Sequence, residues 1–149
     1  MQQMQRLGWD VFGVDLSPTA VDEALRRVGV SRVWEGTIEQ LDSSLGDFDL
    51  IMLNHCLEHV PNPQGTLAEA SRHLRNGGKI KIVVPDAGGI EPRLFGRSWV
   101  GWDVPRHLCN FSEQTLRAFL ADSGFHIITC RPQYTSHSFG AKQLGGVRS

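Results

Sequence analysis

The chain of 149 residues lacks the features that mark several special classes of protein. It contains no apolar run long enough to cross a membrane, and its first residues do not form the apolar core of a signal peptide. Its net charge is only −1, so no general electrostatic attraction to nucleic acid or to an anionic membrane is expected. These absences predict one globular domain over residues 1–149, without a nucleic-acid or membrane partner.

Cysteine is also scarce. The three cysteines, Cys56, Cys109 and Cys130, lie far apart, and the sequence contains no C-x-x-C pair. Neither a disulfide framework nor a cysteine zinc site is therefore predicted. The cytoplasm is the expected compartment, because free thiols are usual there.

The sequence does contain short apolar segments that alternate with amphipathic ones. We expect strands at residues 10–16, 32–36, 48–54, 79–84, 125–130 and 134–139, helices at residues 18–28, 63–74 and 112–123, and a frayed tail from residue 145. The nearly all-apolar segment 48–54 is typical of a strand buried on both faces. This alternation predicts an α/β fold with a parallel, doubly wound sheet.

Ligands of such sheets bind beyond the carboxyl ends of the strands, so the residues there are candidates for a site. Asp15 lies at the end of the first strand, and its carboxylate can accept two hydrogen bonds from a ribose diol or, alternatively, only cap the next helix. Gly36 follows the second strand and permits the close approach of a flat ring, against which Ile38 can pack; a plain turn is the alternative. Asn54 ends the third strand.

Residues 55–59, H-C-L-E-H, fit the zinc-peptidase pattern H-x-x-E-H. That site needs both histidines on one helix, but Pro61 and Pro63 disfavour a helix beyond residue 60. The sequence offers no evident third ligand, since Glu91 and Glu113 are merely available. We therefore predict no metal site.

Residues 87–110 hold glycine, proline, aromatic and basic residues without a clear period, which favours a long functional loop. Trp102, Arg106 and His107 in this loop are candidates for a lid or substrate wall. The alternative is a structural loop anchored by tryptophan, in which His107 binds the backbone.

Several segments in order resemble class I S-adenosylmethionine-dependent methyltransferases. They are V-F-G-V-D-L-S-P-T-A-V, W-E-G-T-I-E-Q-L, F-D-L-I-M-L-N-H-C-L-E-H-V-P-N-P and L-R-N-G-G-K-I-K-I-V-V-P-D. Residues 99–125 resemble a subgroup that methylates small molecules and glycan-pathway compounds. The resemblance covers about residues 8–130 and implies a Rossmann-like, mostly parallel sheet.

The resemblance also implies the cofactor, S-adenosyl-L-methionine, and residues that hold it. Asp15 would bind the ribose hydroxyls, and Leu16 and Ile38 would enclose the adenine. The backbone around Gly36 and Thr37 would form hydrogen bonds with the edge of the adenine. Asn54 and His55 would line the methionine end.

The implied reaction is direct transfer of the sulfonium methyl to a small-molecule or glycan-type acceptor, which depends on positioning and on the exclusion of water. Where the acceptor must lose a proton, the candidate bases are His55, His59 and His107, because histidine titrates near neutral pH. The residues alone do not choose among them.

The sequence departs from the family pattern at its beginning. Family members open with a strand and a glycine-rich G-x-G-x-G turn that cradles the methionine part of the cofactor, and neither is present here. Without that strand, segments 10–16 and 48–54 each lose a ladder partner. We expect these two strands to close up, another segment or chain to fill the gap, or an upstream part to be missing, and we favour an N-terminal truncation.

This departure suggests an alternative function, that of a catalytically incompetent methyltransferase-like fragment. Such a fragment would act as an interaction module and self-associate through exposed strand edges. A zinc hydrolase built on H-x-x-E-H is a third possibility.

Overall fold

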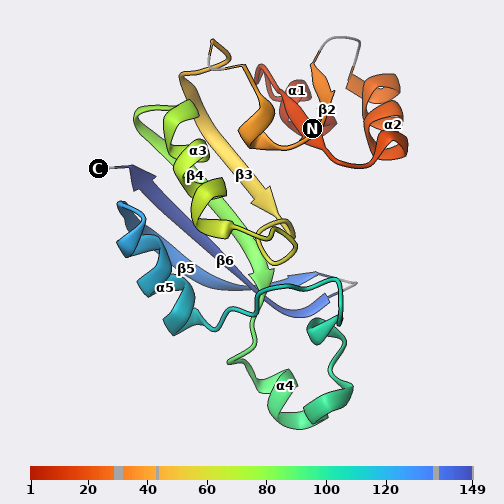
Figure 1. Ribbon diagram of the computed structural model, residues 1–149, viewed down its shortest axis with the longest axis vertical. Helices are drawn as coiled ribbons and strands as arrows, with labels where there is room; N and C mark the ends of the chain where they lie inside the picture. The colour runs from red at the N-terminus through yellow and green to blue at the C-terminus, as the bar shows by residue number, and fades with distance from the viewer. Residues whose placement is uncertain (29–31, 43, 136–137, 149) are drawn as a thin grey trace. The chain divides into compact units, whose positions relative to one another are not determined.

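The computed structural model describes residues 1–28, 32–42, 44–135 and 138–148. The chain divides into two compact units, Met1–Asp42 and Ser43–Ser149. The first unit carries the red to orange elements of Figure 1, and the second carries the yellow to blue ones. Within the described ranges, no helix is both long and apolar enough to cross a membrane.

The first unit contains two short parallel strands joined by a helix. Its elements are α1 (Gln2–Arg6), β1 (Gly13–Asp15), α2 (Pro18–Val28), β2 (Val33–Glu35) and the 3-10 helix η1 (Ile38–Gln40). Asp15 lies opposite Glu35 in the β1–β2 pair. Because the strands are parallel and in register, their carboxyl ends lie at the same edge of the small sheet.

Helix α2 has the bounds that the sequence predicts. The hydroxyl of Ser17, the residue before the helix, accepts a hydrogen bond from the Ala20 amide at 3.3 Å, as an N-cap residue does. Val21 of the helix and Val33 of β2 are buried together in a small apolar core. The amphipathic pattern of the helix therefore fixes it onto the strand pair.

The second unit contains a four-stranded sheet. Its elements are β3 (Phe48–Asn54), α3 (Pro63–His73), β4 (Leu74–Pro85), α4 (Ile90–Phe95), the 3-10 helices η2 (Gly96–Ser98) and η3 (Val100–Trp102), α5 (Glu113–Asp122), β5 (Phe125–Thr135) and β6 (Ser138–Arg148). The strand order is β3–β4–β6–β5 (Figure 1). The segment expected as a loop, 87–110, thus contains a short helix and two 3-10 turns.

This sheet is mixed, whereas the sequence predicts a mostly parallel one. Strands β3 and β4 pair in parallel, but β6 pairs antiparallel with both β4 and β5. Two residues separate β5 from β6, and so short a link joins antiparallel neighbours, because a parallel pair needs a crossover of about a dozen residues. The α/β class is confirmed, and the expectation of a mostly parallel sheet is wrong.

The strand expected at residues 134–139 is also wrong in its bounds. Strand β5 continues to Thr135 and β6 begins at Ser138, so the expected segment contains the end of one strand and the beginning of the next. Residues 136–137 lie outside the described part of the chain.

The tail from residue 145 is paired rather than frayed as far as Arg148. Gly146 pairs with Ile80 of β4. A Cβ atom at Gly146 would lie 3.3 Å from the carbonyl oxygen of His126 on the other neighbouring strand. Glycine therefore suits β6, because this strand lies between β4 and β5. That constraint comes from long-range pairing and cannot be recognised from the local sequence.

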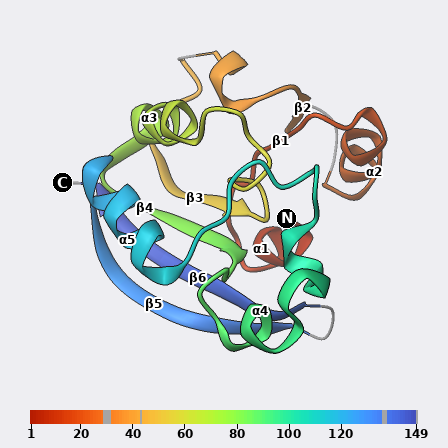
Figure 2. The same cartoon turned by 60° about the horizontal axis from the view of Figure 1, so that its bottom comes forward.

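Two capped helices supply much of the buried core of the second unit. The Asn62 side chain accepts a hydrogen bond from the Gly65 amide at 3.0 Å at the start of α3, and Ser112 caps α5. Leu67 of α3 and Leu116 of α5 are fully buried. Helix α5 packs along β5, in the concave side of the curved strand (Figure 2).

Strand β3 has the predicted bounds but not the predicted burial. Leu53 is its one buried residue, and Met52 is 45% exposed. Among the described strands β3 pairs only with β4, and β1 pairs only with β2. The alternative in which these two strands close up is therefore not seen, since they lie in separate sheets and each has an edge without a strand partner in the described part of the chain.

We expect Leu67→Ala to lower the free energy of unfolding by about 2–5 kcal/mol, because it leaves a cavity in the core. Leu94→Ala in α4 is the matched control, since Leu94 is 73% exposed and its truncation should change the free energy by no more than about 0.5 kcal/mol. Urea denaturation followed by circular dichroism measures both. Equal losses from the two variants would contradict the assignment of the core.

Candidate functional site

Asp15 lies at the carboxyl end of β1 and is exposed. Its Oδ1 atom accepts a hydrogen bond from the Ser17 amide at 2.8 Å, so the carboxylate supports the turn into α2. Leu16 beside it is 69% exposed. The structure thus places one carboxylate and one uncovered apolar side chain together at this strand end.

The neighbouring strand end carries the second group of predicted residues. The Gly36 amide donates a hydrogen bond to the carbonyl of Asp15 at 3.0 Å, which joins the two strand ends. Gly36 has φ +141°, and a Cβ atom there would lie 2.6 Å from Oε1 of Gln40. The backbone conformation favours glycine at this turn, and any other side chain would also displace the end of the Gln40 side chain.

Gln40 is a residue of this strand end that the sequence reasoning missed. Its side-chain oxygen accepts a hydrogen bond from the Thr37 amide at 2.9 Å and completes a capping box at the start of η1. The T-x-x-Q spacing of residues 37–40 is the signal that would have revealed it. The Thr37 amide, predicted to read an adenine edge, is therefore engaged by Gln40, while Ile38 is half-buried.

In the second unit, the chain turns sharply after Asn54, which is exposed at the end of β3. His55 takes φ +50° and donates its amide to the carbonyl of Val83 at 2.9 Å. Residues 57–59 then form a turn and not a helix. The helical arrangement of H-x-x-E-H that a zinc peptidase uses is therefore absent from this described segment, although the prolines alone would still allow one or two helical turns before residue 60.

Glu58 connects this turn to the distant loop. Its carbonyl accepts hydrogen bonds from the amides of Leu108 and Cys109, at 2.7 and 3.2 Å. Its side chain is 1% exposed, and Oε1 lies 3.3 Å from Nδ1 of His55. Within the described residues, Oε2 of Glu58 is buried without a hydrogen-bond partner.

Tryptophan side chains hold the loop that contains η2 and η3. The Trp99 indole is 6% exposed and donates to Oε2 of Glu91 at 3.0 Å. Trp102 meets Trp99 edge to face, with ring centroids 5.0 Å apart, and donates to the carbonyl of Gly96 at 2.8 Å. These contacts support the interpretation of a tryptophan-anchored loop, and they assign Trp102 a structural role in it.

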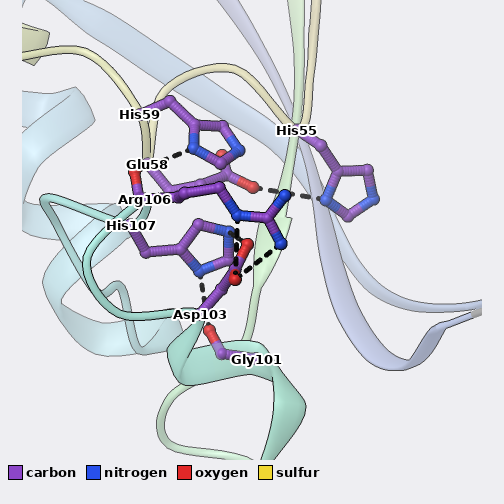
Figure 3. A network of polar contacts seen from close by, with 7 residues as sticks. All are labelled: His55, Glu58, His59, Gly101, Asp103, Arg106 and His107. Carbon is purple, nitrogen blue, oxygen red and sulfur yellow. Dashed lines mark hydrogen bonds and ion pairs between the residues drawn. The ribbon is translucent and has the colours of Figure 1, made fainter.

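Six side chains from the turn and the loop gather in one place, which we call the loop cluster: His55, Glu58, His59, Asp103, Arg106 and His107 (Figure 3). The rings of His59 and His107 meet edge to face with centroids 4.7 Å apart. The structure therefore brings all three candidate bases together, with Arg106 beside them.

The histidines of the loop cluster share one hydrogen-bonding pattern. Nδ1 of His59 lies 2.9 Å from the Arg106 carbonyl, and Nδ1 of His107 lies 2.7 Å from the Gly101 carbonyl. Nδ1 of His55 faces the Glu58 carboxylate. A carbonyl only accepts, so Nδ1 of His59 and His107 must carry the proton, which leaves Nε2 of each neutral ring as a proton acceptor or a cation ligand.

Asp103 carries the second carboxylate of the loop cluster. It receives two hydrogen bonds from the Arg106 guanidinium at 2.7 and 3.1 Å, and this interaction lowers the pKa of Asp103. Its Oδ2 lies 3.7 Å from Nε2 of His107, too far for a hydrogen bond. Asp103 has φ +37°, a left-handed conformation that is unusual for a residue with a side chain.

A separate hollow of about 360 Å³ lies between the end of β4 and the start of α5. Its lining residues are Asp86, Gly88, Gly89, Ile90, Arg93, Ser112, Glu113 and Gln114. The Asp86 carboxylate accepts from the Gly88 amide, and Glu113 pairs with Arg117 on α5. The hollow shares no residue with the loop cluster, and its two carboxylates already serve local structure, so we do not place the site there.

A family model described as a methyltransferase domain matches residues 1–129 of the chain. Demethylmenaquinone methyltransferase of Tropheryma whipplei is 34% identical over 79 residues, which are 52% of this chain and 33% of that protein. Malonyl-[acyl-carrier protein] O-methyltransferase of Hahella chejuensis is 31% identical over 110 residues, 70% of this chain and 38% of that protein. The matches thus span about a third of the length of these curated relatives.

The fold is shared with solved structures. One is Burkholderia thailandensis 1,6-didemethyltoxoflavin-N1-methyltransferase with bound 1,6-didemethyltoxoflavin and S-adenosylhomocysteine. Its TM-score is 0.74 at 20% identity, over 99% of this chain and 64% of that one. At 20% sequence identity, this structural similarity establishes the shared fold alone.

We expect Gly101→Ala to disturb the loop that carries His107, because the new Cβ would lie 2.2 Å from the Trp99 ring. Near-ultraviolet circular dichroism should show a weaker tryptophan signal, and the free energy of unfolding should fall by about 1–3 kcal/mol. Gly145→Ala is the control, since its Cβ would meet Thr129 at an ordinary 3.4 Å. An unchanged spectrum for Gly101→Ala would refute the described packing of the loop.

Proposed function

The chain belongs to the methyltransferase-domain family, and we propose from this membership that it acts in S-adenosyl-L-methionine-dependent methyl transfer to a small-molecule or glycan-type acceptor. The observation that carries the proposal is the family match over residues 1–129, nearly the whole chain. The fold shared with an S-adenosylhomocysteine-bound methyltransferase over 99% of the chain supports it.

The first unit would hold the nucleoside part of the cofactor. Asp15 is exposed at a strand end and has one oxygen engaged by a backbone amide, which leaves its other oxygen to accept from a ribose hydroxyl. The exposed Leu16 and the half-buried Ile38 suit the two faces of an adenine ring. For the Thr37 amide to read the adenine edge, the Gln40 side chain would have to release it.

In the second unit, Asn54 and His55 would meet the methionine end of the cofactor, because they follow β3 at its carboxyl end. The bound cofactor supplies a sulfonium methyl. The chain's own residues contribute by holding the acceptor in line and by keeping water away. Arg106, whose side chain is 76% exposed, and His107 would contact the acceptor, and Trp102 would shape the loop around it.

His55, His59 and His107 remain the candidate bases. The common hydrogen-bonding pattern supports all three, since each ring has its Nδ1 beside an oxygen acceptor. His55 is the one paired with a buried carboxylate, and this contact orients the ring.

A second candidate function is supported by the strand edges. Strands β1 and β3 each have one partner among the described strands, and an uncovered edge is a template for pairing with another chain. A catalytically incompetent fragment would therefore act as an interaction module and self-associate. The zinc-hydrolase alternative loses the helix that its H-x-x-E-H pattern requires, because residues 57–59 form a turn.

We expect Asp15→Ala to weaken the binding of S-adenosylhomocysteine about 10–100-fold, since it removes charge-assisted hydrogen bonds worth about 1.5–3 kcal/mol. Isothermal titration calorimetry measures the affinity. Asp22→Ala is the matched control, because Asp22 is an exposed carboxylate on α2. If both variants bind as tightly as the unaltered chain, Asp15 does not hold the ribose.

Sedimentation velocity separates the two functions. A cofactor-binding chain should sediment as a monomer over a wide range of concentration, whereas an interaction module should associate as its concentration rises. If the chain self-associates and gives no heat of binding on titration with S-adenosylhomocysteine, the interaction-module function is favoured and the methyltransferase function is rejected.

A further inference from the structure

We propose that Glu58, His59 and His107 form a binding site for a divalent transition-metal cation. One ligand atom from each of these side chains lies within 4.8 Å of the other two. This proposal departs from the sequence analysis, which predicts no metal site because H-x-x-E-H lacks a helix and a third ligand. The structure supplies that ligand from a different place, and His55 is not one of the set.

The backbone holds the three residues together. Glu58 and His59 are adjacent in the turn after β3, and His107 comes from the loop (Figure 3). The amides of Leu108 and Cys109, directly after His107, bind the carbonyl of Glu58. Backbone hydrogen bonds thus fix the loop beside the turn, independently of any attraction between the side chains.

Both histidines are already arranged as ligands. Each donates Nδ1–H to a backbone carbonyl, His59 to Arg106 and His107 to Gly101. Metal-binding histidines commonly make such a second hydrogen bond, which orients the ring and leaves Nε2 to coordinate. The tautomer that a cation needs is therefore the one that the surrounding backbone selects.

A second, independent observation that supports the cation site concerns the Glu58 carboxylate. It is 1% exposed, and Oε2 has no hydrogen-bond partner in the described part of the chain. A buried carboxylate oxygen without a partner is costly. A cation beside it would remove that cost, while His55 at Oε1 holds the carboxylate in place.

The donor set indicates the kind of cation. Two imidazoles and one carboxylate are a ligand set of zinc and of other first-row transition metals, whereas Mg²⁺ and Ca²⁺ prefer oxygen ligands alone. Zinc–nitrogen bonds of about 2.0–2.1 Å place tetrahedral ligand atoms about 3.3 Å apart, so ligand atoms that lie within 4.8 Å of one another close by at most about 1.5 Å on binding. His59 is exposed, so a cation can reach the site and keep a coordination position open to water or to an oxygen of another molecule.

If the acceptor of the methyl group is an alcohol or phenol, its oxygen is suited to the open position, where a cation lowers the pKa of the bound group. This last step rests on the proposed function. Binding of the cation itself does not, because none of the three ligands belongs to the predicted cofactor-binding set.

Cobalt(II) tests the site directly, because its visible absorption reports the ligands. The full chain is stripped with a chelator, the chelator is removed, and cobalt chloride is added while absorption and heat are recorded. We expect saturation at one equivalent and the bands of a nitrogen- and oxygen-ligated ion, with no thiolate charge-transfer band. Zinc chloride should displace the cobalt.

Glu58→Gln, His59→Gln and His107→Gln should each weaken cobalt binding at least tenfold. His126→Gln is the matched control, since His126 is exposed on β5 outside the loop cluster, and it should bind as the unaltered chain does. Circular dichroism checks that each variant is folded. If a substitution at a buried position such as Glu58 unfolds the chain, His59→Gln still tests the proposal, because His59 is exposed and its substitution should leave the fold intact.

Failure of the unaltered chain to give a saturable cobalt spectrum would overturn the proposal, as would undiminished binding by His59→Gln or a thiolate band. Calorimetry with S-adenosylhomocysteine on the same samples separates this outcome from failure of the proposed function. If the chain binds cobalt but not S-adenosylhomocysteine, the proposed metal site stands and the proposed methyltransferase function is rejected. If it binds S-adenosylhomocysteine but not cobalt, only the metal site is rejected.

Discussion

The loop cluster depends on one backbone carbonyl, that of Glu58. The hydrogen bonds that it accepts from Leu108 and Cys109 join the turn after β3 to the loop that carries His107. Both partners are amides, so the link does not depend on the identity of those two side chains. If it were broken, the carbonyl of the buried Glu58 would lose its partners, at a cost of about 1–3 kcal/mol, and His107 would lose its place beside Glu58.

Two residues that shape this region adopt conformations that side chains disfavour. His55 and Asp103 have φ of +50° and +37°. The Asp103 carbonyl accepts hydrogen bonds from the amides of Arg106 and His107, and its carboxylate accepts from Arg106, so the surroundings hold it there. Left-handed conformations of residues other than glycine concentrate at functional sites, which agrees with the placement of the candidate site.

Local signals predicted the elements that depend on local interactions. The bounds of α2 and β3 follow from a capping serine and an apolar run, and the approach of Asp15 to Gly36 follows from parallel strand ends. The place of β6 between two strands and the meeting of Glu58 with His107 did not follow, because both are long-range contacts without a sequence period. The prolines limited any helix at H-x-x-E-H to one or two turns, but they carried no information about which distant residue would face Glu58.

The position of β6 has a consequence for the order in which the second unit can form. This strand is the last in the described chain, yet it lies between β4 and β5 and is the neighbour through which β5 joins the sheet. During synthesis from the N-terminus, β4 and β5 therefore leave the ribosome before the strand that joins them. Until residues 138–148 emerge, both strands expose edges that other nascent chains can pair with. Closure of this sheet therefore waits for the last of the described strands.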